Sequence, residues 1–234
     1  MTVGFDTATA DTAACALRDG EVVFEALLGP SERRGPLHTT ALLGELERAA
    51  AAVGGWDAVG RIAVGVGPGS FTGLRVGIAT ARALGLSGAL PVSGVGTLDA
   101  LGRGIGEAAP GKGRLAVLDA RRGEVVAALY SANGEQLWGP LLSSPDELAG
   151  RIGTLAEPVL CGGSGAVRFR QQFASRGAEI PDDADPVHRV AARHICALAT
   201  VGPGEDESGS VAPIYLRPPD AERWRERDSL QAPE

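Results

Sequence analysis

The pattern of apolar and polar positions occurs twice along the chain, once in each half. Short apolar runs predict strands, and apolar residues spaced three or four positions apart predict helices. In the first half the predicted elements are strands over 3–6, 12–17, 21–28 and 61–66, a helix over 36–53, a glycine loop over 67–73 and a helix that follows it to about residue 86. Asp19 and Gly20 predict a tight hairpin turn between the second and third strands.

The second half shows the same order. Its predicted elements are strands over 115–118, 125–130, 135–142 and 158–161, a helix over 145–155, a glycine loop over 162–165 and a helix that follows it to about residue 175. In both halves the first strand leads into an aspartate, Asp6 or Asp119. A connector rich in glycine and proline, over 103–113, separates the halves.

Strands that feed helices returning to the same sheet produce mixed α/β layers. Two such halves resemble the actin-like ATPase (ASKHA) superfamily of sugar kinases, Hsp70 and actin, in which nucleotide lies in the cleft. We therefore expect an α/β fold of two similar subdomains, each with a mixed β-sheet flanked by helices. The expected divisions are a partner-binding N-terminal subdomain over 1–103, a C-terminal subdomain over 104–217 and a charged tail over 218–234 that contains Trp224. A linker is expected over 203–213.

Composition and charge narrow the class of protein. Of the 234 residues, 44% are hydrophobic and 22% are charged, as in ordinary globular proteins. No apolar run is long enough to span a bilayer, and the N-terminus lacks the basic cluster of a secretory signal. Cys15, Cys161 and Cys196 have neither the spacing of a zinc knot nor the even number of a disulfide framework. The net charge of −7 argues against a protein that grips nucleic acid by itself. We expect a cytoplasmic protein without membrane association.

The end of the first strand resembles a phosphate-binding turn with one change. Actin-like ATPases have Asp-x-Gly-x-Thr here, whereas this chain has Asp6-Thr7-Ala8-Thr9. Alanine adds a Cβ where the backbone should approach phosphate closely. The turn is therefore either a weak, vestigial nucleotide site or a polar turn at a strand end. The candidate nucleotide-binding residues are Asp6, Thr7, Thr9, Gly67, Gly69 and Ser70.

The string GPGSFTGLRVG, residues 67–77, is the most distinctive in the chain. It lacks the Lys-Ser/Thr ending of a Walker A loop and the spacing of a dinucleotide fingerprint. Ser70 or Thr72 can cap the following helix, and amides at the start of that helix could hold an anion. Both a tight strand-to-helix turn and an anion site are open interpretations.

One face of that helix has almost no side-chain bulk, because Gly73, Gly77, Ala81 and Gly85 recur every four residues. Glycine inside a helix costs about 1 kcal/mol relative to alanine, so close approach by another element must compensate. That element is either an internal helix or sheet or another subunit. Arg75 opposes the helix dipole, so we expect it to have an acidic partner. Arg75 and the four small residues form the predicted interface.

No residue pattern indicates a catalytic or metal site. His38 has an apolar residue four positions later, and His188 and His194 do not share a helix face. We expect each histidine to be solvated or to cap a helix. Ser70 has no Gly-x-Ser-x-Gly frame, and no cysteine lies in an activating setting. The charged turn over 119–124 is either a solvated loop or a contact surface facing the cleft.

Long strings of the sequence resemble the bacterial TsaB (YeaZ) family. They extend from Phe5 to Arg217 and read FDTATADTAACAL, GVGPGSFTGLRVGIATARALGL, SGVGTLDAL, LDARRGEVVAALY and PIYLR. Members of this family are subunits of the machinery that makes threonylcarbamoyladenosine in tRNA. Arg122 stands where the family often has methionine, a small departure that puts nothing central in doubt.

The resemblance implies an actin-like protein that is not an enzyme on its own. Family members pair with the related catalytic subunit TsaD, which transfers the threonylcarbamoyl group to the tRNA adenosine adjacent to the anticodon. The ATPase TsaE joins the pair, and helices of the N-terminal subdomain make the subunit contact in homodimers. The implied partners are thus a TsaD-like subunit, a TsaE-like ATPase, a second copy of this chain and, through the complex, tRNA. No cofactor of its own is implied, since the partner subunits use ATP.

Two other functions are compatible with the same fold. A small-molecule kinase or ATPase would use Asp6 and the glycine loop over 67–73. A peptidase is the third possibility, because relatives of this fold were once labelled glycoproteases, but the sequence has neither a zinc pair nor a credible nucleophile. The leading hypothesis is a non-catalytic scaffold subunit.

Overall fold

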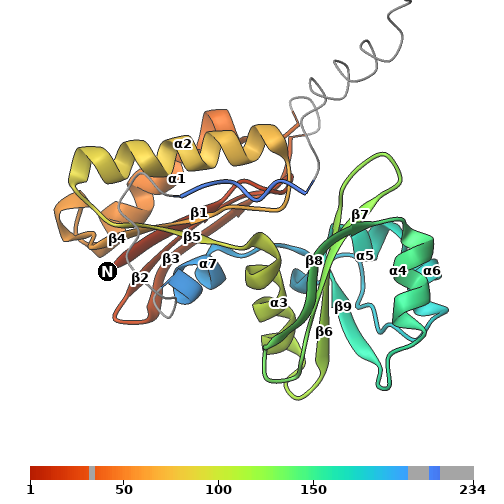
Figure 1. The fold of residues 1–234 in the computed structure, drawn as a ribbon. Helices are drawn as coiled ribbons and strands as arrows, with labels where there is room; N and C mark the ends of the chain where they lie inside the picture. The colour runs from red at the N-terminus through yellow and green to blue at the C-terminus, as the bar shows by residue number, and fades with distance from the viewer. Residues whose placement is uncertain (32–34, 200–210, 217–234) are drawn as a thin grey trace, which may run out of the picture.

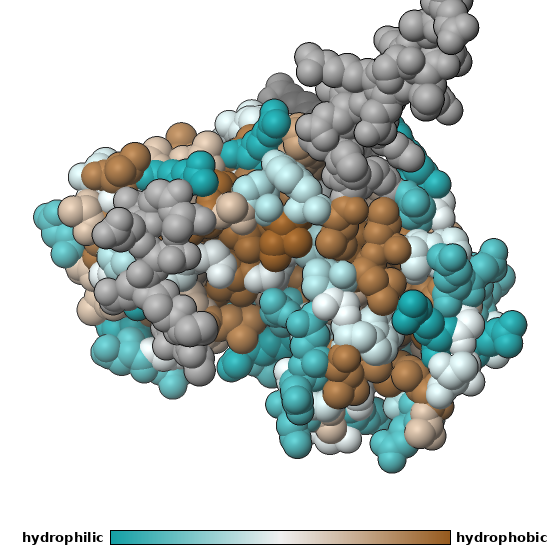
Figure 2. Space-filling model, in the orientation of Figure 1, coloured by the Kyte–Doolittle hydropathy of each residue, from teal (hydrophilic) through white to brown (hydrophobic). Residues whose placement is uncertain are grey.

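The computed structural model describes residues 1–31, 35–199 and 211–216. It consists of two β-sheets that lie side by side, each covered by helices (Figure 1). The strand order is β3-β2-β1-β4-β5 in the first sheet and β8-β7-β6-β9 in the second. On the face drawn in Figure 2, hydrophobic residues gather in the middle of the molecule, where the two halves meet.

The first sheet combines antiparallel and parallel strand pairs. Its strands are β1 (Thr2–Asp6), β2 (Thr12–Arg18), β3 (Glu21–Leu28), β4 (Arg61–Gly65) and β5 (Val92–Val95). β1, β2 and β3 form an antiparallel meander, whereas β4 is parallel to both β1 and β5. Because β1 and β4 run in the same direction, Asp6 and the glycine loop after β4 meet at the same end of the sheet.

Helices cover both faces of the first sheet. They are α1 (His38–Val53), the short helix η1 (Trp56–Ala58), α2 (Phe71–Gly88) and α7 (Ala192–Ala199). Successive residues of a strand point to opposite faces. Ala14 and Ala16 of β2 accordingly pack in the core with α1 and α2, while Ala13, Cys15 and Leu17 pack against α7. Figure 1 shows α1 and α2 on one side of the strands and α7 on the other.

The second sheet repeats this layered arrangement. Its elements are α3 (Thr97–Ala108), β6 (Gly113–Asp119), β7 (Val125–Tyr130), β8 (Gln136–Ser143), α4 (Pro145–Ile152), β9 (Val159–Gly162), α5 (Ser164–Arg168), α6 (Arg170–Ala174) and η2 (Pro186–His188). Ala116 and Leu118 of β6 face the core that contains α3. Leu115 and Val117 face the opposite core, which contains α4 and α6.

The structure confirms the repeated order of strands, helices and glycine loops and corrects the connector expected over 103–113. Most of that segment belongs to α3, whose Leu98, Leu101 and Ile105 are buried at helical spacing. Three glycines lower the apparent helix propensity of this segment, and each leaves space for a neighbouring side chain. A Cβ on Gly102, Gly104 or Gly106 would come within 3.0 Å or less of Tyr130, His194 and Arg114 respectively.

Three further elements differ from the sequence-based prediction. Strand β5 and helix α7 were not expected, and the helix expected up to about residue 175 is divided into α5 and α6. Helix α7 packs against β1 and β2, although its residues fall in the range expected for the C-terminal subdomain. The divisions at residues 103 and 217 therefore follow chain order and do not say which sheet each helix covers; as domain boundaries they stay predictions.

The predictions for the C-terminal part fall largely outside the described residues. The charged tail over 218–234 with Trp224, and residues 203–210 of the expected linker, belong to the parts that are not described. Within 211–216, Val211 is buried in the core beneath α1 and α2, and the N–H of Ile214 donates to the carbonyl of Val66 at 2.8 Å. This segment therefore packs beside the glycine loop that follows β4.

Among the helices described, none combines the length and the apolar character that crossing a bilayer requires.

Candidate functional site

The carboxylate of Asp6 is buried at the C-terminal end of β1. One oxygen accepts the backbone N–H of Ala8 at 2.8 Å, and the other accepts the hydroxyl of Thr97 at 2.9 Å. A Cβ on Gly65 would come within 1.8 Å of the second oxygen, so the carboxylate fills the space above β4. Burial outweighs these hydrogen bonds and raises the pKa of Asp6 to about 6. The side chain is thus turned towards β4 and the start of α3.

The glycine loop is folded directly onto the Asp6–Thr9 turn. The N–H of Ser70 donates to the carbonyl of Ala8 at 2.7 Å, and the hydroxyl of Thr7 donates to the carbonyl of Gly73 at 2.8 Å. A Cβ on Gly69 would approach the Ala8 oxygen to 2.3 Å, and one on Gly73 would approach the Thr7 oxygen to 1.9 Å. The glycines are therefore needed so that two segments of this chain can touch.

The structure brings the six candidate nucleotide-binding residues together, but it uses their polar groups internally. Thr9 accepts the N–H of Asp11 at 3.2 Å, and Ser70 caps α2 by accepting the N–H of Gly73 at 3.3 Å. The N–H of Gly67 donates to Thr97 at 3.1 Å. These contacts support the interpretation as a structural turn between strand and helix. Nucleotide binding by this turn stays an untested prediction.

The histidines are buried, which corrects the expectation that they are solvated or cap helices. His38, His188 and His194 all lie in the interior. The Nε2 of His38 faces the carbonyl of Thr9 at 3.1 Å and must therefore carry the proton, so Nδ1 accepts the hydroxyl of Thr12 at 2.8 Å. His38 thereby ties the start of α1 to the β1–β2 turn. The spacing of residues along the chain carries no signal for this role.

The small-residue face of α2 is an internal packing surface. Gly73, Gly77, Ala81 and Gly85 are buried, and a Cβ on Gly77 would come within 2.4 Å of the Thr7 hydroxyl. The Asp6–Thr9 turn approaches this face at Gly73 and Gly77, and Val64 of β4 approaches it at Gly77, so the face packs inside the protein. A part for these four residues in a subunit interface stays an untested prediction. The alternative that the sequence left open, close approach by an internal element, is the one found.

The opposite face of α2 is exposed and carries little charge. It presents Thr72, Arg75, Ala79, Ala83 and Leu86 to solvent, and we call these five residues the outer face of α2. The side chain of Leu86 is 72% exposed. The sequence of α2 contains two arginines and no acidic residue. Apolar and small residues at helical spacing on an exposed face are typical of a surface that another helix covers.

Among the described residues, the partner of Arg75 is aromatic and not the acidic one that the sequence predicted. Its guanidinium lies 3.8 Å from the centre of the Phe71 ring, a cation–π contact. The Phe71 ring in turn contacts that of Tyr215 with the ring centres 5.2 Å apart. This stack continues the outer face of α2 onto the segment over 211–216.

The charged turn after β6 occupies the place in the second half that the Asp6 turn occupies in the first. Asp119 accepts the guanidinium of Arg168 at 2.7 Å, and its N–H donates to Ser164 at 3.1 Å. Arg121 and Arg122 are exposed and have left-handed backbone conformations, with φ of 62° and 54°. Both a solvated loop and a contact surface stay compatible with this geometry.

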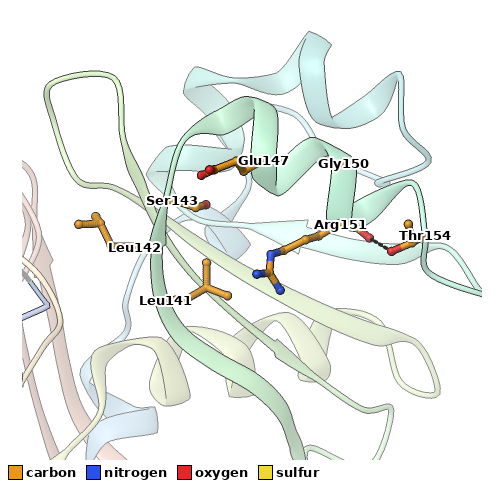
Figure 3. A pocket seen from close by; sticks show the side chains of 7 residues that line it. All are labelled: Leu141, Leu142, Ser143, Glu147, Gly150, Arg151 and Thr154. Carbon is orange, nitrogen blue, oxygen red and sulfur yellow. Dashed lines mark hydrogen bonds between the residues drawn. The ribbon is translucent and has the colours of Figure 1, made fainter.

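A pocket lies between the edge strand β8 and the exposed side of α4 (Figure 3). It is lined by Leu141, Leu142, Ser143, Glu147, Gly150, Arg151 and Thr154. Glu147 accepts the N–H of Ser144 at 3.0 Å and so caps α4, and the hydroxyl of Thr154 donates to the Arg151 carbonyl at 2.7 Å. None of the candidate residues from the sequence lines it. In the described part of the chain, no three His, Cys, Asp or Glu side chains are grouped as a metal site would require.

Comparison of the chain with known proteins identifies sequence relatives. The family model described as TsaD, tRNA N6-adenosine threonylcarbamoyltransferase, matches residues 34–169, more than half of the chain. An uncharacterized protein of Mycobacterium tuberculosis is 33% identical over 222 residues, which cover 94% of this chain and 92% of that protein. The Escherichia coli tRNA threonylcarbamoyladenosine biosynthesis protein TsaB is 34% identical over 137 residues, which cover 58% of this chain and 57% of that protein.

Solved structures show the fold. YeaZ from Pseudomonas aeruginosa superposes with a TM-score of 0.74 at 22% identity, covering 92% of this chain and 99% of YeaZ. A ROK hexokinase from Thermus thermophilus superposes with a TM-score of 0.50 at 12% identity, covering 86% of this chain and 98% of the hexokinase. The two-sheet arrangement is thus the actin-like, or ASKHA, fold expected from the sequence. With the matching family model and the sequence relatives, the chain belongs to the TsaB (YeaZ) branch of the TsaD-related proteins.

Proposed function

We propose that this protein is a non-catalytic accessory subunit in the formation of threonylcarbamoyladenosine in tRNA. The name of the Escherichia coli relative supports the pathway. The geometry of the Asp6 turn supports the non-catalytic role, because Asp6 bonds to Ala8 and Thr97 while Ser70 bonds to Ala8. Groups that would face phosphate or metal in an active member of this fold are engaged with each other.

The observation that carries the proposal is the outer face of α2. Its five residues are exposed and include one charge, so covering them with a second helix would remove apolar surface from water at little cost in charge desolvation. On α1, which packs beside α2, Leu43 is 64% exposed. We infer that a TsaD-like catalytic subunit binds here, and that a second copy of this chain occupies the same surface when the protein is alone.

The other partners in this proposal are those that the family resemblance implies. A TsaE-like ATPase joins the pair and uses the ATP, so this chain needs no cofactor of its own. Transfer RNA is held mainly by the rest of the complex, since a chain with a net charge of −7 is a poor electrostatic match for phosphate. Such a complex works in the cytoplasm.

The proposal is tested by deleting the gene and analysing tRNA nucleosides. We expect threonylcarbamoyladenosine to be lost in the deletion strain, and an affinity-tagged copy of the chain to restore it and to co-purify with a TsaD-like subunit. Normal levels of the modified nucleoside in the deletion strain would contradict the proposal.

A further inference from the structure

Between residues 35 and 199 the chain passes from one sheet to the other at two places. The first lies between β5 in the first sheet and α3, which packs on β6 of the second. The second lies between η2, which packs against α3 and α5, and α7, which packs on β1 and β2. A hinge motion between two halves requires backbone rotation at such crossing segments.

The first crossing is held by Thr97, the first residue of α3. Its hydroxyl donates to the buried carboxylate of Asp6 at 2.9 Å and accepts the N–H of Gly67 at 3.1 Å. Its own N–H donates to the carbonyl of Gly67 at 2.8 Å. Three hydrogen bonds thus attach the start of α3 to β1 and to the loop after β4, in the interior of the protein.

The second crossing is held by two consecutive side chains that reach in opposite directions. The Nδ1 of His188 accepts the N–H of Gly163, in the loop after β9, at 3.2 Å. The guanidinium of Arg189 donates two hydrogen bonds of 2.8 Å to the carboxylate of Asp11, in the β1–β2 turn. One residue therefore binds the second half and the next binds the first. Paired bonds of this kind fix orientation as well as distance.

We propose that these two links lock the relative orientation of the two sheets, so that the protein is a rigid body and does not close around nucleotide. One crossing segment is bonded to the last residue of β1, Asp6, and the other to Asp11 in the turn that follows β1. Rotation at either crossing would break a buried hydrogen bond or a bidentate ion pair. This proposal concerns the chain itself and does not depend on the partners proposed above.

The test measures the distance between the two halves with spin labels. Glu21→Cys in β3 and Glu157→Cys before β9 are exposed positions, one in each half. The native cysteines are buried, so the labels react at the introduced sites. We expect double electron–electron resonance on the full chain to give one narrow distance distribution, which ATP with magnesium at about 1 mM, the upper end of the usual range of KM values, leaves unchanged.

Two variants and a matched control identify the cause of the rigidity. Arg189→Ala and Thr97→Val should each broaden the distribution. Arg168→Ala is the control, because the Arg168–Asp119 pair lies within the second half and its exposures, 48% and 13%, resemble the 38% and 15% of the Arg189–Asp11 pair. Because the Arg189 pair is partly exposed, its variant keeps the test valid if Thr97→Val fails to fold. A broad distribution in the unaltered chain, a shift on adding ATP, or equal widths for Arg189→Ala and Arg168→Ala would overturn the proposal.

Discussion

Asp6 shows how a residue with the chemistry of an active site can serve a structural purpose. The residue is 1% exposed, and its carboxylate is held by neutral donors from Ala8, Thr97 and the backbone of Thr9. An ionised carboxylate in such a position is destabilised by the loss of water, and the neutral donors compensate only in part. The raised pKa of Asp6 results from this balance, so the titration of Asp6 depends on its surroundings being folded.

The raised pKa of Asp6 predicts an unusual dependence of stability on pH. Because the folded protein binds this proton with a pKa of about 6, against 3.8 for an unperturbed aspartate, the contribution of Asp6 to the free energy of unfolding falls as the pH rises from about 4 to 6 and then levels. A shift of this size corresponds to about 3 kcal/mol. Urea unfolding at several pH values should show the advantage of Asp6→Asn over the original chain growing across this range. A difference that does not vary with pH would contradict the buried, ionised state.

Gly77 provides a second prediction, about packing. Gly77→Leu should destabilise the monomer by about 1–3 kcal/mol or more, because even its Cβ would meet the Thr7 hydroxyl at 2.4 Å. Ala79→Leu, on the outer face two positions away, should change the Tm little. Thermal unfolding of the two variants checks this, and equal Tm values would mean that the small face is not packed as described.

The sequence predicted which residues gather around Asp6 but not the hydrogen bonds that they form. The strings around Asp6 and Gly67 placed both residues at strand ends, where parallel strands bring them together. Thr97 was not singled out, since a threonine after a short strand is common and its partners lie far away in the chain. The burial of His38 was not predicted for the same reason, because it results from the β1–β2 turn packing over this residue.

At the scale of elements, α2 carries two different surfaces on one helix. The inner surface has the glycines that let the Asp6–Thr9 turn approach, and the outer face is exposed and nearly uncharged. The sequence of α2 shows the stripe of small residues but leaves open whether an internal element or another subunit approaches it. A stripe of small residues shows only that something approaches closely, and the sheet and turn of the same chain are what approaches.

The outer face of α2 leads to a prediction about binding. Leu86→Glu should weaken association with a TsaD-like subunit by about tenfold or more, because it replaces the most exposed large apolar side chain of the outer face with a charge. Leu137→Glu is the matched control, since Leu137 is 56% exposed on β8 in the other half. Isothermal titration measures both affinities. Equal weakening by the two variants, or no weakening by Leu86→Glu, would place the contact elsewhere.

Element prediction succeeded where the apolar period was regular and failed where glycine interrupted it. The strands β1, β2, β6 and β7 and the helix α1 follow their patterns closely. Helix α3 was taken for a connector because Gly102, Gly104 and Gly106 lower the apparent helix propensity. Those glycines are explained by tertiary contacts with residues such as Tyr130 and Arg114, which a pattern within the segment cannot contain.

At the scale of the whole molecule, the two halves share one layout but differ in the environment of the aspartate that ends the first strand of each half. The Asp6 turn is closed by the glycine loop and by α3, whereas Asp119 forms an ion pair with Arg168 in a partly exposed turn. The duplicated order of elements was readable from the sequence, and the fold followed from it. The sequence did not predict that α7 packs on the first sheet, because the strands it contacts are the first ones of the chain.

The closed Asp6 turn predicts weak or absent nucleotide binding by the chain alone. Calorimetry with ATP and magnesium should show no micromolar binding, because the amides that would meet phosphate are bonded to Asp6 and Ala8. Micromolar affinity would favour the kinase or ATPase alternative for this fold.

The central claim is that this chain is required for threonylcarbamoyl transfer without performing it. Reconstitution with purified components tests this most directly, by measuring threonylcarbamoyladenosine in tRNA after incubation with a TsaD-like subunit, a TsaE-like ATPase and the threonylcarbamoyl donor, with and without this chain. We predict product when all components are present and none when this chain is omitted or is the only protein. Product formed by this chain alone, or equal product without it, would contradict the account.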